Sequence, residues 1–134
     1  MFRIKYCREA VLKLLYQADV LNLNSQFNAD QLLTNDIVFF KGINRVEKSY
    51  ILKIVQRVLD EKKNIDLLIS KNLIGWKLER LMPVDRALLR MGVAESYYSD
   101  QKAIIIDDII RIAKKYGGED SYKIINAILD KVIA

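Results

Sequence analysis

FRIKYCREAVLKLLYQADVL, residues 2–21, has the apolar periodicity of an amphipathic helix. At 3.6 residues per turn, one face of this helix carries Cys7, Val11, Leu14 and Ala18. Tyr16 falls about 160° away from that face, beside Lys5, Glu9 and Leu12. A helix that only builds a core does not need a tyrosine and a leucine on its solvent side. We therefore expect Tyr16 and Leu12 to face something other than the core.

Composition sets the class of protein around this helix. The 134 residues are 51% hydrophobic and 29% charged, which predicts one globular domain over residues 1–134 rather than disorder. No apolar run reaches the roughly 18 residues of a membrane span. The charged residues near the start are not followed by an uninterrupted apolar stretch, so we expect no secretory signal there. The lone Cys7 has no partner for an internal disulfide, which fits a cytoplasmic protein. The net charge of +5 favours polyanionic partners without proving one.

Helical patterns continue along most of the chain. Residues 21–36 are rich in Asn, Ser and Asp and are typical of a connector, with room for one short turn. Beyond it, Asn64 is a candidate helix cap, and Pro83 suits the first turn of a helix. Apolar residues recur at helical spacing within 46–59, 65–69, 83–98, 106–116 and 121–132. The sequence predicts an all-α fold with six or seven helices.

The residue inventory excludes several kinds of catalytic site. Without histidine, and with one cysteine, the chain has no zinc-ligand set and no Cys–His or Ser–His–Asp arrangement. The adjacent carboxylates Asp107 and Asp108 diverge by about 100° on a helix. Asp107 lies four residues before Arg111, which predicts a solvated ion pair. We expect no enzyme activity, no metal and no cofactor.

Two residues have both a structural and a functional interpretation. Glu95 lies within an apolar helical stripe, where an unpaired carboxylate would be costly. An arginine or a backbone cap elsewhere would satisfy it, and a ligand site is the alternative. Trp76 is either a surface platform or, as we expect, a partly buried anchor between helices.

The first sixteen residues concentrate positive charge. Arg3, Lys5, Arg8 and Lys13 against Glu9 give a net +3, which suits RNA phosphates. The alternative is an ordinary solvated helix face. Tyr16 with Leu12 fits a protein interface, or else packing beneath the connector at 21–36.

Three stretches together resemble the NusB family of bacterial transcription antitermination factors. They are REAVLKLLYQADV near the start, WKLERLMPVDRALLRMGVAE in the middle and IDDIIRIAKKYGGEDSYKIINAILDK at the end. The resemblance implies two small helical bundles packed together. It also implies binding to the single-stranded boxA element of nascent ribosomal RNA transcripts together with the ribosomal protein NusE. The complex would act with other Nus factors on RNA polymerase.

The resemblance also assigns roles to individual residues. On the protein-partner face it places Tyr16, next to Leu12, and Asp85. Ile124 stands at a position that is often aromatic, and Asp107–Asp108–Ile109 replaces the usual Asn-Glu-Ala motif. The RNA-binding residues it implies are Arg3, Lys5, Arg8, Asp120, Ser121 and Lys123.

Two alternatives remain open at this point. The same helical fold occurs as the RNA-positioning module of ribosomal RNA cytosine methyltransferases, but the sequence to Ala134 shows no nucleotide-binding or cysteine-nucleophile segment. The chain could also form a homodimer through the Tyr16 face.

Overall fold

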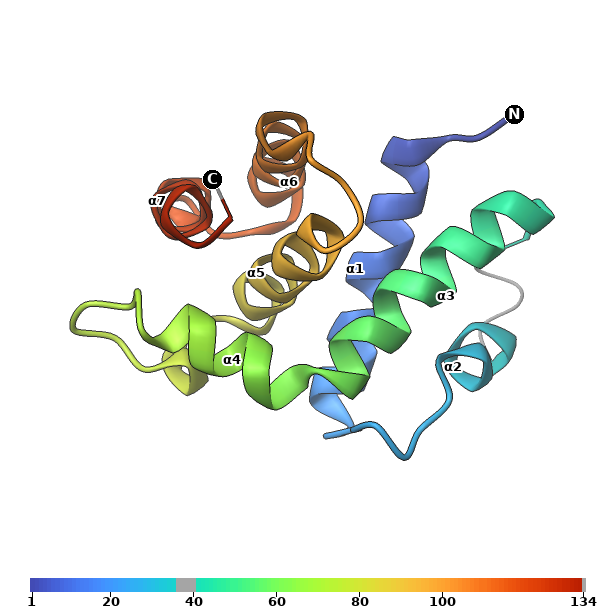
Figure 1. The fold of residues 1–134 in the computed structure, drawn as a ribbon, viewed down its shortest axis with the longest axis horizontal. Coiled ribbons are helices and arrows are strands. Elements are labelled where there is room, and N and C mark those ends of the chain that lie inside the picture. Colours follow the sequence, from blue (N-terminus) through green and yellow to red (C-terminus); the bar gives the residue numbers. More distant parts are fainter. Residues whose placement is uncertain (36–40, 134) are drawn as a thin grey trace.

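The computed structural model describes residues 1–35 and 41–133. This part of the chain forms only helices, which confirms the all-α prediction, and Figure 1 shows their arrangement. In chain order they are α1 (Ile4–Val20), α2 (Ala29–Asn35), α3 (Arg45–Asp60), α4 (Lys62–Ser70), the 3₁₀-helix η1 (Leu78–Arg80), α5 (Pro83–Ser96), α6 (Lys102–Tyr116) and α7 (Ser121–Val132).

Local sequence explains where several helices begin and end. Asn44 caps α3 by accepting a hydrogen bond from the Glu47 N–H, while the Glu47 carboxylate accepts one from the Asn44 N–H. Pro83 occupies the first turn of α5, as predicted. Gly117 ends α6 with its N–H donated to the Ala113 carbonyl. The prediction for Asn64 is wrong, because α4 already begins at Lys62.

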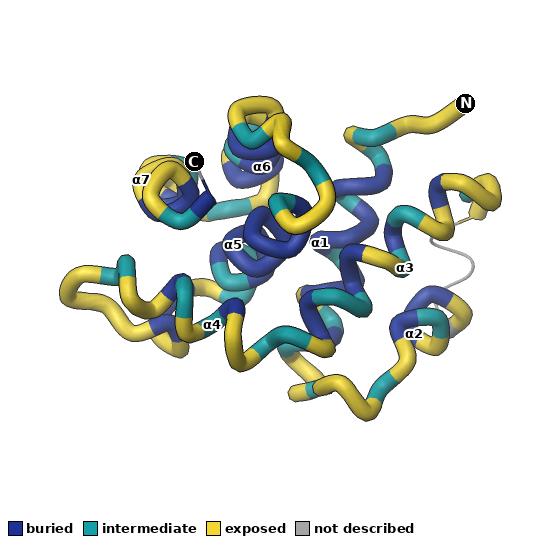
Figure 2. The backbone as a smooth tube through the Cα atoms, viewed as in Figure 1, coloured by how far each residue is buried: buried dark blue, intermediate teal, exposed yellow. Residues whose placement is uncertain are grey.

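Helix α5 is the centre of the packing. It contacts α1 and α3 on one side and α4, α6 and α7 on the other, so it lies between a group formed by α1–α3 and a group formed by α4, α6 and α7 (Figure 1). Every residue from Ala87 to Glu95 is buried, and Figure 2 shows α5 as the most continuously buried helix. A Cβ on Gly92 would lie 2.9 Å from Leu129 Cδ2, so this glycine allows α5 and α7 to approach closely.

The connector at 21–36 contains more structure than one turn. Its helix α2 buries Ala29, Leu32 and Leu33, and α2 packs against α3. The Gln56 side chain of α3 accepts a hydrogen bond from the Ala29 N–H at 2.8 Å and helps to hold the start of α2. The end of the predicted connector, residue 36, lies outside the described residues.

Candidate RNA and protein interfaces

Arg3 is held at the amino end of α1 by an ion pair with α3. Its Nη2 lies 2.8 Å from Glu47 Oε1, and its backbone N–H also donates to this carboxylate. Hydrogen bonding from Arg3 lowers the pKa of Glu47 to about 2, so Glu47 stays ionised. The Glu47 side chain has no exposed surface, whereas that of Arg3 is 42% exposed. Arg3 and the neighbouring, exposed Lys5 thus present positive charge to solvent.

Arg8 points inward instead. Its guanidinium lies 3.0 Å from a Glu95 oxygen and 2.9 Å from Asp108 Oδ2, and its side chain is only 9% exposed. The Tyr50 hydroxyl also donates to Glu95. Arginine therefore satisfies the buried carboxylate, as expected, and burial raises the pKa of Glu95. The prediction that Arg8 presents its charge outward is wrong, because two buried carboxylates draw it into the core.

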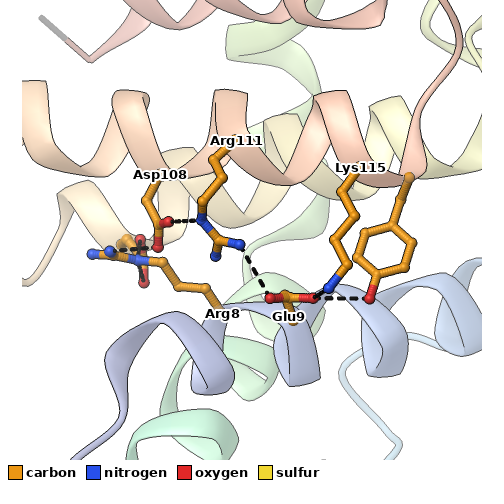
Figure 3. Close-up of polar contacts among 7 residues, drawn as sticks. Arg8, Glu9, Asp108, Arg111 and Lys115 are labelled. Carbon is orange, nitrogen blue, oxygen red and sulfur yellow. Dashed lines mark hydrogen bonds and ion pairs between the residues drawn. The ribbon is translucent and has the colours of Figure 1, made fainter.

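A chain of charged side chains continues from this buried group to the surface of α6. Arg111 lies 2.5 Å from Asp108 Oδ1 and 3.2 Å from Glu9 Oε2, while Lys115 Nζ lies 2.8 Å from Glu9 Oε1 (Figure 3). Arg111 thus pairs with Asp108 and Glu9 rather than with the predicted Asp107, which is exposed. These contacts fix α1 against α6.

Glu9 is the outer anchor of this chain. It also accepts a hydrogen bond from the Tyr116 hydroxyl at 2.8 Å. Burial raises the pKa of Glu9, but the bonds from Lys115, Tyr116 and Arg111 outweigh it and bring the pKa to about 2. Lys115 and Tyr116 therefore lie beside α1, close to Lys13, whose Nζ is 5.9 Å from the Tyr116 ring centre. Lys115 and Tyr116 were not predicted from the sequence as residues of this surface. The available signal was the run KKY at the end of α6, residues 114–116, which joins two cations to an aromatic ring.

The three residues at the start of α7 that were expected to bind RNA differ in their exposure. Asp120 and Lys123 are exposed and lie 3.4 Å apart as an ion pair. Ser121 is buried and its hydroxyl accepts a hydrogen bond from the Gly118 N–H at 2.8 Å. Asp120 and Lys123 can reach a ligand directly, whereas Ser121 shapes the turn before the helix. Ile124 is half-buried against the core.

Asp85 lies behind this turn rather than on an open surface. It is 5% exposed, and burial raises its pKa while the Ser121 hydroxyl opposes that shift. Its Oδ1 is buried without a hydrogen-bond partner. The structure thus places Asp85, expected on the protein-partner face, against Ser121, expected on the RNA face.

Tyr16 and Leu12, both expected on the protein-partner face, also differ in their exposure. Tyr16 is 42% exposed, as predicted. Leu12 is 3% exposed, so its predicted outward position is wrong. The reason is that α2, α3, α5 and α6 all contact α1 and cover more of its circumference than one apolar face. Trp76 is 59% exposed, so the prediction of a partly buried anchor is also wrong.

The described residues define an all-helical protein with charged and aromatic side chains exposed on its surface. Within residues 1–35 and 41–133, no group of three His, Cys, Asp or Glu side chains could hold a metal ion. None of the helices described is long and apolar enough to cross a membrane. The surface offers exposed cations at the start of α1, the end of α6 and the start of α7, with the exposed Tyr16 on the same α1 helix.

Comparison with known proteins identifies the family of this chain. The sequence model of the NusB family matches residues 6–134, so the chain belongs to the NusB family. A transcription antitermination protein NusB from Nitratiruptor is 35% identical over 126 residues, covering 93% of this chain and 87% of that protein. The Clostridium botulinum protein of the same name is 33% identical over 132 residues, or 96% of each chain.

Solved structures agree with this assignment. T. maritima NusB has a TM-score of 0.86 at 30% identity and covers 99% of this chain and 92% of its own. A crystal structure of the antitermination factors NusB and NusE in complex with double-stranded RNA has a TM-score of 0.84 at 27% identity, covering 96% and 94%. The relatives are named as antitermination proteins and not as enzymes.

Proposed function

We propose that the protein is a transcription antitermination factor that binds boxA RNA of nascent ribosomal RNA transcripts together with NusE. It would act with other Nus factors on RNA polymerase, in the cytoplasm, as a single domain over residues 1–134 that needs no cofactor. The observation that carries this proposal is the family match over residues 6–134, joined to the fold likeness with the NusB–NusE–RNA complex.

For RNA contact we assign the exposed side chains of Arg3, Lys5, Asp120 and Lys123. The three cations can neutralise phosphates, and Asp120 can accept hydrogen bonds from base or sugar donors. Two further residues of the expected set act from beneath the surface. Arg8 locks α1 to α5 and α6, and Ser121 fixes the turn that positions Asp120 and Lys123.

For NusE contact we assign Tyr16, because an exposed tyrosine beside buried aliphatic residues is a common anchor of protein interfaces. Leu12 lies beneath the surface of the same helix, and the buried Asp85 supports the turn before α7. Leu12 therefore supports the partner face from beneath rather than contacting NusE, whereas Asp85 supports the turn that carries Asp120 and Lys123.

The RNA assignment is tested by charge removal at two exposed positions. Lys5→Gln/Lys123→Gln should weaken boxA RNA binding and lower the slope of log affinity against log salt by about 1.4, from about 0.7 per phosphate contact. The matched control is Lys63→Gln/Lys77→Gln, which removes the same charge from exposed positions in and after α4. Equal salt slopes for the two variants would contradict the assignment.

A further inference from the structure

A row of aromatic and basic side chains covers one face of α3 and the turn that follows α5, and its amino end borders Arg3. We call it the α3 strip, and it consists of Arg45, Tyr50, Lys53, Arg57, Tyr97 and Tyr98. Lys53 Nζ lies 4.4 Å from the ring centre of Tyr98, and Arg57 Cζ lies 4.5 Å from that of Tyr97. These contacts bring residues 40 and 45 positions apart into one surface, where α5 ends beside α3 (Figure 1).

The cations of the α3 strip have no carboxylate partner among the described residues. The single acidic residue of α3 before Asp60 is Glu47, which has no exposed surface and is paired with Arg3. Glu61, close enough to Tyr97 to influence its pKa, is the acidic group at the far end of the strip. The Nε of Arg57 is buried without a hydrogen-bond partner. Within the described part of the chain, no carboxylate therefore forms an ion pair with Lys53 or Arg57.

The strip also has open aromatic surface and a depression at its amino end. Tyr97 is 42% exposed and Tyr98 is 43% exposed, so each ring retains surface beyond its contact with a cation. Phe2 packs edge-on against Tyr50, with ring centres 5.4 Å apart. A depression of about 490 Å³ is lined by Phe2, Arg45, Val46, Ser49, Tyr50 and Lys53. From Arg45 to Arg57 the strip follows about 18 Å of helix, at 1.5 Å per residue.

We propose that the α3 strip is a second binding surface, which takes a single-stranded RNA segment. Bases would stack on the tyrosine rings, and Arg45, Lys53 and Arg57 would neutralise phosphates, because alternating rings and cations match the alternating bases and phosphates of a single strand. The strip meets the α1 surface at Arg3, which is paired to Glu47 of α3. The inference rests on the proposed RNA-binding function and extends the RNA path around the amino end of α1 onto α3.

The test uses the full chain and a fluorescein-labelled 20-nucleotide oligouridylate, with fluorescence anisotropy at several salt concentrations. Tyr98→Ala should weaken binding about fivefold or more, the loss expected for one stacked base, while Tyr98→Phe should bind as the parent does. Lys53→Gln/Arg57→Gln should lower the salt slope by about 1.4, and Lys53→Gln alone by about 0.7. Lys63→Gln/Lys77→Gln is the charge-matched control, and circular dichroism checks that each variant is folded.

Each outcome decides between the strip and the surface assigned above. Weaker binding in Tyr98→Ala and Lys53→Gln, with ultraviolet crosslinks to the peptide containing Tyr97 and Tyr98, supports the inference. Normal binding in these variants overturns it, and leaves the proposed function intact if Lys5→Gln/Lys123→Gln still weakens binding. Equally strong competition by a polyglutamate peptide would also overturn it, because the strip would then recognise an acidic protein segment rather than bases.

Discussion

Replacing Arg8 with methionine tests whether this residue stabilises the fold or contacts RNA. The substitution keeps an unbranched side chain with good helix propensity and removes the charge that faces Glu95 and Asp108. These carboxylates are 3% and 6% exposed, so neither can regain full hydration. Removing one partner of a buried ion pair typically costs about 3–5 kcal/mol.

The structure places the cost near the lower end of that range. Tyr50 still donates to Glu95, and Arg111 still pairs with Asp108, so both carboxylates keep one partner. We expect a loss of about 3 kcal/mol in the free energy of unfolding. With a urea m-value near 2 kcal/mol/M, the midpoint of unfolding falls by about 1.5 M.

Urea unfolding followed by far-ultraviolet circular dichroism measures this shift. Lys5→Met is the control on the exposed side of the same helix and should change stability by no more than about 0.5 kcal/mol. Neutralising the carboxylates as well, in Arg8→Met/Glu95→Gln/Asp108→Asn, should restore most of the loss. A fully stable Arg8→Met variant that nevertheless binds RNA more weakly would refute this reasoning and make Arg8 a direct contact.

Three further predictions concern other elements. Tyr16→Asp should weaken NusE binding by about 2 kcal/mol or more without loss of helical circular dichroism; unchanged calorimetric affinity, or light scattering that shows only a disrupted homodimer, contradicts it. Gly92→Ala should destabilise the fold by about 1–3 kcal/mol in urea unfolding, because the new Cβ meets Leu129; a neutral effect would mean that α7 yields. Glu9, with its pKa lowered to about 2, stabilises the fold above pH 4.5, and this contribution is lost as pH falls from 4.5 toward 2. Thermal unfolding of Glu9→Gln should therefore depend less on pH across that interval than unfolding of the parent, and parallel curves would exclude the effect.

The helices could be predicted from the sequence because their apolar spacing and their terminal residues are local signals. Pro83 and Gly117 mark helix ends by backbone geometry alone, whatever packs around them. Asn64 failed as a cap because the turn from α3 into α4 takes a single residue, Glu61. Apolar spacing predicts that a segment is helical, but it does not predict how short the connection to the next helix is.

The candidate site was harder to predict because exposure depends on tertiary packing. Leu12 and Tyr16 lie on the same side of the helical wheel, yet only Tyr16 is exposed once four helices surround α1. The need for a cation beside Glu95 was visible in the sequence, but not that Arg8, 87 residues earlier, would supply it. The α3 strip had no local signal, since its side chains come from α3 and from the turn after α5, which meet only in the fold.

The central claim is that this NusB-family chain binds boxA RNA together with NusE. A titration of labelled boxA RNA with the protein, with NusE and with both, at two salt concentrations, tests it most directly. We predict tighter binding by the pair than by either protein alone, with a salt slope that falls in Lys5→Gln/Lys123→Gln. Binding by the pair no stronger than by NusE alone, with the same salt slope, would contradict the account.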